Sequence, residues 1–274
     1  MRHLNVIELI VKLSPAAAAL CKCPSHFIGG SLVSPPVRAL LYHLSRLIAK
    51  IVFAPFVKVH VLRPGIGRRE GAWILAANHI SHFDPPLLAI AARRKIDWMG
   101  MIELFRQPLF GAWLRGIDGF PVDRARLDRQ AVRMALGRLR AGHAVGMFPE
   151  GGIRDGARSV LEGAPVRPGV AGLSQMTAAP IIPCVIMGSD RIYILFRLWR
   201  PGRRIPVWIA FGQPLLPDTG IDRAAARAAL EARLADGFRQ LAVEMRGHFQ
   251  LSEDDLPQSP VRRRAYSVEA LRDR

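Results

Sequence analysis

Residues 73–86 read WILAANHISHFDPP, an apolar run that passes into a polar turn and ends in two prolines. The run 73–77 has the length and composition of a buried strand. Pro85 suits the first position of a helix over residues 85–92, where the missing N–H of proline costs nothing. A strand that leads directly into a helix is the unit of α/β folds, and their ligands bind at the carboxyl ends of the strands. The polar turn therefore lies where we expect a site.

The same alternation of apolar runs and helical patterns continues along the chain. The predicted strands are 144–148, 181–186 and 205–211, and the predicted helices are 127–141, 168–178 and 222–247. We therefore expect an α/β domain with a mixed, largely parallel sheet flanked by helices. The prolines of 180–183 are expected to mark an edge or the start of their strand.

His79 and Asp84 form the most chemically informative pair in the polar turn. The turn can bring the carboxylate to one imidazole nitrogen and leave the other nitrogen free to accept a proton. Two alternatives stay open: Asp84 caps the following helix, or His79, His82 and Asp84 bind a metal ion. The remaining histidines are scattered without a second motif, so we expect no metal.

Two further segments carry charged residues near predicted strand ends. Residues 119–124 read GFPVDR and end in Arg124. Residues 148–156 read FPEGGIRDG, and their glycines allow backbone N–H groups to approach an anion closely. A surface charge and an ordinary turn explain these two segments equally well when each is taken alone.

Residues 37–53 predict an amphipathic helix. The apolar side chains fall on one side at helical spacing: Val37, Leu40, Leu41, Leu44, Leu47, Ile48, Ile51 and Val52. Arg38, Arg46 and Lys50 fall on the other side. Such a helix suits an anionic membrane interface, with its apolar face in the acyl region and its basic residues at the head groups. An ordinary helix packed on a core is the alternative.

The charge balance calls for an anionic partner. The chain of 274 residues has 39 Lys+Arg against 22 Asp+Glu, a formal net charge of +17. Phosphates, acidic lipids and nucleic acid all attract such a surface. We expect no nucleic acid, because no nucleic-acid motif accompanies the arginines and they are dispersed through predicted helices. Three cysteines are too few for a disulfide framework, which favours a reducing compartment.

In order and spacing, these segments resemble the glycerolipid acyltransferase family over roughly residues 57–217. The first family block, Asn-His-x-Ser-x-x-Asp, is matched by Asn78, His79, Ser81 and Asp84. The second block ends in an arginine, matched by Arg124, and the fourth is the proline-containing strand at 180–183.

The third family block, usually Phe-Pro-Glu-Gly-Thr-Arg-Ser, is matched only in its first half. Phe148, Pro149, Glu150 and Gly151 agree with it. Gly152 and Ile153 then stand where threonine and arginine are usual, and Arg154 comes one position later.

The resemblance implies acyl transfer from an acyl-CoA or acyl-carrier-protein thioester to the hydroxyl of 1-acyl-glycerol-3-phosphate, giving phosphatidic acid in phospholipid synthesis. It implies His79 as general base, oriented by Asp84, and no cofactor beyond the co-substrate. The acceptor's glycerol phosphate would be held by Arg124, Glu150, Gly151 and Arg154, with Glu150 accepting from a hydroxyl or fixing an arginine. Glycerol 3-phosphate, another lysophospholipid or an aminolipid are the alternative acceptors.

The expected organisation has four parts. Residues 1–36 form a poorly defined N-terminal segment, 37–57 the membrane-associating helix, 58–248 the acyltransferase domain and 249–274 a flexible charged tail. The longest uncharged stretch, 168–189, is broken by prolines and is not expected to span a membrane. We expect a peripheral or monotopic protein on the anionic cytoplasmic face of the cell membrane.

Overall fold

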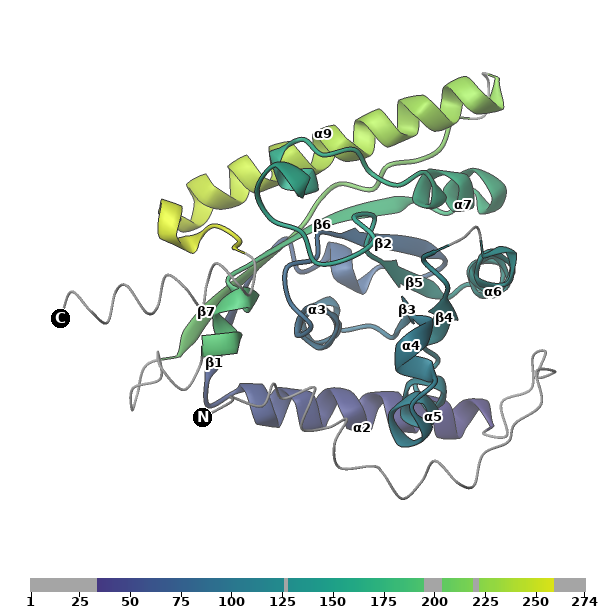
Figure 1. Cartoon of the computed structure of the whole chain (residues 1–274), viewed down its shortest axis with the longest axis horizontal. Helices are drawn as coiled ribbons and strands as arrows, with labels where there is room; N and C mark the ends of the chain where they lie inside the picture. The colour runs from purple at the N-terminus through teal and green to yellow at the C-terminus, as the bar shows by residue number, and fades with distance from the viewer. Residues whose placement is uncertain (1–33, 126–127, 195–203, 219–221, 259–274) are drawn as a thin grey trace.

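The fold is organised around one seven-stranded sheet. A computed structural model describes residues 34–125, 128–194, 204–218 and 222–258. The strands lie side by side in the order β1-β7-β6-β2-β5-β3-β4, crossing the middle of the molecule in Figure 1. Their bounds are β1 Val57–Leu62, β2 Trp73–Ala77, β3 Ile96–Met101, β4 Phe120–Val122, β5 Ala144–Met147, β6 Ile181–Met187 and β7 Ile205–Phe211.

The strand pairing confirms the predicted mixed, largely parallel sheet. Neighbouring strands in the described sheet run parallel to each other, with one exception: β6 and β7 are antiparallel. Strand β2 lies between β5 and β6 and is parallel to both. The segments that follow these three strands therefore meet at one edge of the sheet.

Strand β2 is buried on both faces, which explains its continuous apolar sequence. Ile74 and Ala76 belong to one core cluster, whereas Trp73, Leu75 and Ala77 belong to a second cluster on the opposite face of the strand. All five side chains are inaccessible to solvent. The strand that carries the polar turn is thus fixed from both sides.

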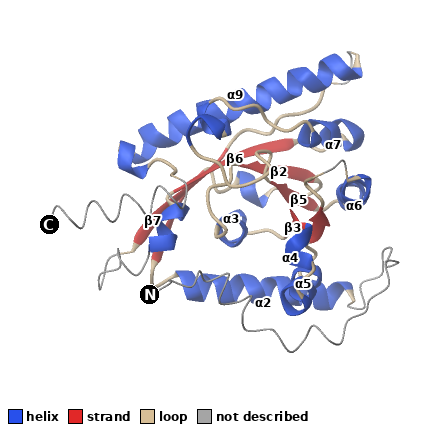
Figure 2. Cartoon of the chain, viewed as in Figure 1, coloured by secondary structure: helices blue, strands red, loops and turns tan. Residues whose placement is uncertain are grey.

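Helices cover both faces of the sheet, as Figure 2 shows. Their bounds are α2 Pro35–Phe53, α3 Asp84–Ala92, α4 Ile102–Phe105, α5 Pro108–Gly116, α6 Arg129–Arg140, α7 Gly169–Thr177 and α9 Arg223–Phe249. Helices α6, α7 and α9 lie on one side of the sheet, and α2, α3 and α5 lie on the other (Figure 1). None of the helices in the described residues is long and apolar enough to cross a membrane.

Pro183 does not mark an edge strand, so that part of the expectation is wrong. Strand β6 is interior and fully buried, with β2 on one side and β7 on the other. The ladder between β6 and β7 begins at Cys184, one residue after Pro183, and the Pro183 carbonyl accepts from Gly212 N–H at 2.8 Å. The proline is tolerated because it lies just outside the ladder that would have used its N–H.

Helix α2 exposes most of its apolar side chains and turns Tyr42 and Arg38 toward the protein. The exposed members are Val37, Leu40, Leu44, Leu47, Ile48, Ile51 and Val52. Tyr42 is buried, and its hydroxyl donates to the Arg94 carbonyl and accepts from Ile96 N–H, both at 3.1 Å. Arg38 forms an ion pair with the buried carboxylate of Asp118 at 2.6 Å. The expectation that Arg38 faces lipid head groups is therefore wrong, because this ion pair holds it against the protein.

The segment after α9 is packed where the structure describes it. Leu251 is buried, residues 253–255 form a 3-10 turn, and Asp255 pairs with Arg191 at 2.7 Å. The expectation of a flexible tail is therefore wrong for residues 249–258. Residues 259–274 of that tail and residues 1–33 of the N-terminal segment lie outside the described residues.

Candidate active site

The candidate site lies where the segments after β2, β5 and β6 meet. His79 is the second residue after β2, and Glu150 is the third residue after β5. The backbone N–H of His79 donates to Glu150 Oε2 at 2.6 Å, and the carbonyl of His79 accepts from Arg154 N–H at 2.9 Å. These two hydrogen bonds join the predicted catalytic turn to the predicted anion-binding loop.

The His79 imidazole is held by a buried carboxylate. Nδ1 of His79 lies 2.8 Å from Asp84 Oδ2, and the Asp84 side chain is fully buried. Because the carboxylate accepts, the network assigns the ring proton to Nδ1 and leaves Nε2 as the basic nitrogen. No group in the described part of the chain hydrogen-bonds to Nε2. The pair therefore has the geometry of an oriented general base.

Asp84 also closes the turn that carries His79. Its Oδ2 accepts from the backbone N–H groups of Ile80 and Ser81, each at 2.8 Å, and its Oδ1 accepts from the Ser189 hydroxyl at 2.5 Å. Ser189 follows β6, and no motif in the sequence pointed to it. One carboxylate thus fixes the imidazole, the turn and the segment after β6 together.

The helix-cap alternative for Asp84 is wrong. An N-cap carboxylate accepts from N–H groups two or three residues further along the chain. Asp84 instead accepts from residues that precede it, and Phe83 takes the flanking position of α3. Ser81 serves as a turn hydroxyl, because its Oγ accepts from Phe83 N–H at 3.1 Å.

His82 points to a different partner from His79. Its backbone N–H donates to the Tyr193 hydroxyl at 2.9 Å, and its ring contacts the same oxygen. Burial, followed by the nearby His79, lowers the pKa of His82 below its usual value. Across the residues that the structure places, no group of three His, Cys, Asp or Glu side chains could hold a metal ion.

Aromatic rings fix the plane of the His79 imidazole. Phe148 stacks on His79 with a centroid distance of 4.0 Å and an interplanar angle of 19°. Trp98 in turn stacks on Phe148, with a centroid distance of 5.4 Å. No sequence pattern indicated that either ring orients the base. The stack restricts rotation of the imidazole, which is itself only 8% exposed.

Asn78 anchors the end of β2 immediately before His79. Its side-chain amide donates to the Ile186 carbonyl at 3.0 Å, and its side-chain carbonyl accepts from Ile186 N–H at 2.8 Å. This pair of hydrogen bonds imitates one more rung between β2 and β6. Asn78 therefore acts on the position of the histidine through the backbone.

Glu150 has a structural role that the sequence did not predict. Its Oε1 accepts from the Ser159 hydroxyl at 2.8 Å and from Val160 N–H at 2.9 Å, while Oε2 accepts from His79 N–H. Burial raises the pKa of Glu150, and these hydrogen bonds act in the opposite direction. Both carboxylate oxygens are engaged in a buried clamp, so the role that the structure shows for Glu150 is to hold the backbone beside the base. Glu150 is a positioning residue for His79.

Comparison with known proteins identifies the region that contains this site. Residues 58–187 match a protein-family model described as Acyltransferase. The chain carries an acyltransferase-family domain. The matched residues include His79, Asp84, Arg124, Glu150 and Arg154.

Two bacterial proteins named 1-acyl-sn-glycerol-3-phosphate acyltransferase are similar to this chain. The protein from Bacillus subtilis (strain 168) is 27% identical over 129 residues, which cover 47% of this chain and 62% of that protein. The protein from Streptococcus pneumoniae (strain ATCC BAA-255 / R6) is 27% identical over 180 residues, which cover 62% of this chain and 63% of that protein. The chain therefore spans a little under two thirds of the length of these relatives.

A solved structure supports the fold of the acyltransferase domain. The crystal structure of the 1-acyl-sn-glycerophosphate (LPA) acyltransferase from Thermotoga maritima matches with a TM-score of 0.54 at 21% identity. The match covers 74% of this chain and 81% of that chain. It agrees with the α/β sheet described above.

The acyltransferase domain brings three arginines to the glycine turn after β5. A Cβ at Gly152 would lie 3.8 Å from the guanidinium carbon of Arg154 and 3.9 Å from Arg124 Nη1. A Cβ at Gly151 would lie 2.3 Å from the guanidinium carbon of Arg167. Arg124 and Arg154 were predicted here, but Arg167 was missed. It precedes α7 and lies outside the matched motif blocks, so only the fold shows its position.

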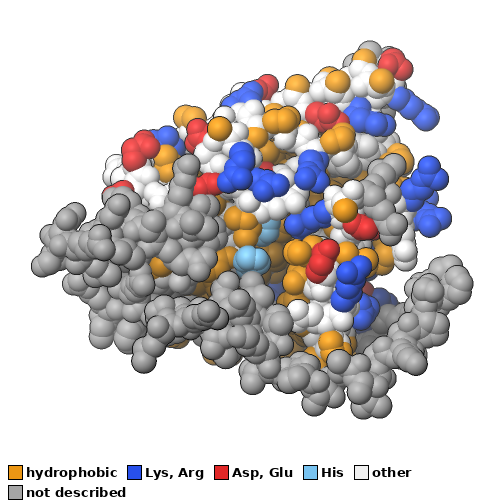
Figure 3. Space-filling view, viewed as in Figure 1, with side chains coloured by type: hydrophobic (Ala, Val, Ile, Leu, Met, Phe, Trp, Pro, Cys, Tyr) orange, Lys and Arg blue, Asp and Glu red, His pale blue; other side chains and the backbone are white. Residues whose placement is uncertain are grey.

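The face that carries the site combines basic and apolar surface. Figure 3 shows histidine atoms near the centre of this face, with hydrophobic atoms around them and a group of Lys and Arg side chains above. Arg124 and Arg167 are exposed and Arg154 is half-buried. A ligand from solution can therefore reach the arginines of the acyltransferase domain directly.

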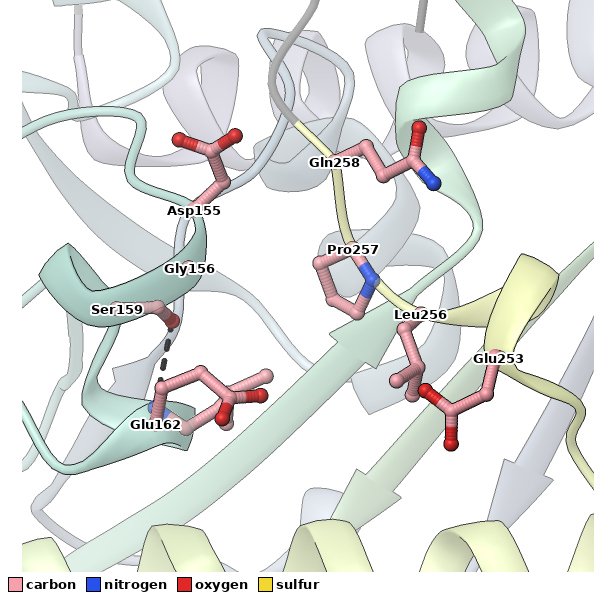
Figure 4. Close-up of a pocket in the computed structure, with 9 residues that line it drawn as sticks. Asp155, Gly156, Ser159, Glu162, Glu253, Leu256, Pro257 and Gln258 are labelled. Atoms are coloured by element: carbon pink, nitrogen blue, oxygen red, sulfur yellow. Dashed lines mark hydrogen bonds between the residues drawn. The ribbon is translucent and has the colours of Figure 1, made fainter. Parts of the chain in front are cut away.

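A separate pocket of about 210 Å³ lies beyond the Glu150 clamp (Figure 4). Ser159 belongs to both the clamp and the lining of this pocket. Asp155, Glu162 and Glu253 also line it, whereas no Lys or Arg is among its lining residues. The pocket therefore offers no cation to a phosphate, which favours the arginines at Gly151 and Gly152 as the anion site.

Proposed function

We propose that the acyltransferase domain moves an acyl group from a coenzyme A or acyl-carrier-protein thioester to the free hydroxyl of 1-acyl-glycerol-3-phosphate. The product is phosphatidic acid for phospholipid synthesis. The observation that carries the proposal is the His79–Asp84 pair, at 2.8 Å, on a turn bonded to the arginine-bearing loop. A base beside a cationic site suits an acceptor that has a hydroxyl and a phosphate. The names of the two bacterial relatives support the same acceptor.

In the proposed mechanism, Nε2 of His79 takes the proton of the acceptor hydroxyl while its oxygen attacks the thioester carbonyl. A C–O bond forms, the C–S bond then breaks, and the proton passes from His79 to the leaving thiolate. A thiol with a pKa of about 8.5 leaves without a separate acid. Asp84 stabilises the imidazolium, and such a base is typically worth roughly 10²- to 10⁴-fold in rate.

The proposed reaction needs no acyl-enzyme intermediate. Ser81 is engaged in its turn, and Cys184 is fully buried in the core. Burial raises the pKa of the Cys184 thiol well above its usual value, so it is not an activated nucleophile. Direct transfer from donor to acceptor is therefore the simpler reaction.

The test of this function is acyl transfer by the wild type and by His79→Ala. One acyl thioester is offered with 1-acyl-glycerol-3-phosphate, glycerol 3-phosphate, another lysophospholipid and an aminolipid. We expect the first acceptor to be preferred and His79→Ala to lose nearly all turnover with its fold intact. His248→Ala, which removes an exposed histidine from α9, is the control. Turnover above a few per cent in His79→Ala would remove His79 as the base, and preference for another acceptor would change the substrate.

We also propose that α2 seats the domain on the cytoplasmic face of the membrane, as a peripheral or monotopic protein. Seven apolar side chains of α2 are exposed, and the neighbouring helix α5 exposes Leu109, which is 77% accessible. Trp113 of α5 donates from Nε1 to Ser45 Oγ at 2.9 Å and thereby ties the two helices together. A tryptophan with its N–H satisfied beside apolar surface is typical of a membrane interface.

Contacts at the end of α2 relate this surface to the site. The Phe53 ring packs edge-on against Phe83 at a centroid distance of 5.9 Å. Phe83 directly precedes Asp84 in the turn that carries the base. This contact supports a membrane-seated arrangement in which the acyl chain of the acceptor stays in lipid while its head group reaches His79.

A further inference from the structure

The three arginines at the glycine turn lack the partners that other arginines of the domain have. Arg38, Arg138 and Arg191 each contact a carboxylate at 2.6 to 2.7 Å. Within the residues that the structure describes, Arg124, Arg154 and Arg167 have no carboxylate within ion-pair distance. Their charge is therefore left for a ligand.

The three guanidinium groups are close enough to influence one another. Although the Arg124 side chain as a whole is exposed, partial burial of its guanidinium lowers its pKa, and the charges of Arg167 and Arg154 lower it further. Only Glu103 acts in the opposite direction. Like charges held this close repel, and a bound anion relieves that repulsion.

Gly151 makes the space that Arg167 occupies. Its φ of +70° is unfavourable for residues with a side chain, and any Cβ would overlap the Arg167 guanidinium. The backbone N–H of Arg167 donates to the Pro149 carbonyl at 3.0 Å, and that of Arg154 donates to His79. Both arginines are therefore fixed relative to the base.

We propose that Arg167 is a third ligand of the acceptor's phosphate, and that the three arginines together select a phosphate monoester over a phosphodiester. A monoester carries a charge of about −1.5 to −2 at pH 7 and offers three free oxygens. A diester carries one charge and offers two free oxygens. Each planar guanidinium can donate to these oxygens through its fork of N–H groups. This inference rests on the proposed function, since it assigns a substrate class to the same site.

The experiment measures binding by calorimetry in the wild type, Arg167→Gln and Arg140→Gln. The probes are glycerol 3-phosphate, a monoester, and glycerophosphocholine, a diester. Arg140→Gln removes the same charge from an exposed position at the end of α6, at the opposite edge of the sheet. We expect Arg167→Gln to weaken glycerol 3-phosphate binding about tenfold, the loss of one charge-assisted contact, with glycerophosphocholine changed less than about twofold. Arg140→Gln should match the wild type.

Two further measurements distinguish an Arg167 that binds the phosphate directly from one that only supports the structure. Arg167→Lys keeps the charge without the fork, so it should recover part of the affinity. The second pKa of a phosphate monoester is about 6, so the wild type should lose its preference for the monoester as the pH falls below that value. Arg167→Gln should show a weaker pH dependence over the same range.

Unchanged binding of glycerol 3-phosphate by Arg167→Gln would overturn the inference, as would an equal loss for both probes or in Arg140→Gln. Failure of the wild type to bind glycerol 3-phosphate would also overturn it. Acyl transfer is assayed separately on the same samples. A wild type that binds the monoester through Arg167 but transfers no acyl group would leave the inference standing and remove the proposed function.

Discussion

At the residue scale, the site depends on the four hydrogen bonds that Asp84 accepts. Three of them reach Oδ2, from the His79 ring and from two backbone N–H groups, and one reaches Oδ1 from Ser189. The same carboxylate therefore shapes the turn and sets the charge beside the imidazole. These two roles can be separated experimentally, because an amide side chain keeps an accepting oxygen at the position of Oδ2 but carries no charge.

Asp84→Asn should keep the turn and lose the reaction. The amide oxygen can replace Oδ2, and the amide nitrogen can face the Ser189 hydroxyl, which is able to accept. We expect kcat to fall roughly 10²- to 10⁴-fold because the imidazolium loses its counter-charge. Weaker hydrogen bonds should lower the free energy of unfolding by about 1 to 2 kcal/mol. Steady-state kinetics and chemical denaturation measure the two effects.

Ser189→Ala is the matched control for Asp84→Asn. It removes the hydroxyl from Oδ1 and leaves the three bonds to Oδ2 in place. Its kcat should fall less than about tenfold, since the charge and the histidine contact remain. A kcat for Asp84→Asn within about threefold of the wild type would show that the carboxylate charge has no part in the reaction.

The sequence reveals the parts of the site that are close together in the chain. His79 and Asp84 are five residues apart, so their spacing and the strand-to-helix context predict their contact. Ser189 is 105 residues from Asp84, and its contact depends on β6 lying beside β2. Arg167 similarly depends on how the chain returns past Gly151. The contacts of Glu150 with His79 and Val160 likewise depend on the fold, because these residues are 71 and 10 positions away from it in the chain.

At the element scale, α2 is an amphipathic helix with its polar contacts directed toward the protein. Tyr42 and Arg38 fasten it to the loop and strand residues beneath, and Ser45 receives Trp113 from α5. Its apolar side chains are left facing outward. An ordinary surface helix has the reverse arrangement, so the outward face calls for an apolar neighbour.

Leu44→Glu combined with Ile51→Glu should release the protein from vesicles. Both side chains are about half exposed, so the fold should lose little stability. Withdrawing two apolar side chains from lipid should weaken flotation with anionic vesicles by at least about tenfold. Val243→Glu is the control, because Val243 is 70% exposed on α9, across the sheet from α2 (Figure 1). Flotation of the double variant at the wild-type level would remove α2 as the membrane seat.

The elements that periodicity predicted are those with strong, uninterrupted patterns. Strands β2, β5, β6 and β7 and helices α2, α3, α6, α7 and α9 were predicted to within a few residues. Strands β1, β3 and β4 were not predicted. Strand β4 has three residues, and β3 contains Asp97, whose buried carboxylate is bonded to Arg138 at 2.6 Å and His143 at 2.9 Å. Asp97 is stable in a buried strand because Arg138 of α6 and His143 of the following turn bond to it, and these contacts depend on the fold.

At the scale of the whole molecule, the basic residues behind the net charge of +17 have different surroundings. Some arginines neutralise buried carboxylates, as Arg38 and Arg138 do with Asp118 and Asp97. Others gather near the site on the face shown in Figure 3. Excess basic charge on a protein with an outward apolar helix favours an anionic membrane over a neutral one.

Salt should therefore separate the electrostatic and apolar parts of membrane binding. Raising NaCl from about 0.1 M to about 1 M shortens the Debye length from ~10 Å to ~3 Å. Each basic residue near an anionic surface is worth about 1 kcal/mol, so the partition coefficient on anionic vesicles should fall at least about tenfold. Weaker binding to neutral vesicles should persist at both salt concentrations, because apolar burial is not screened. Flotation at each concentration measures both, and salt-independent binding to anionic vesicles would show that the basic residues do not face the membrane.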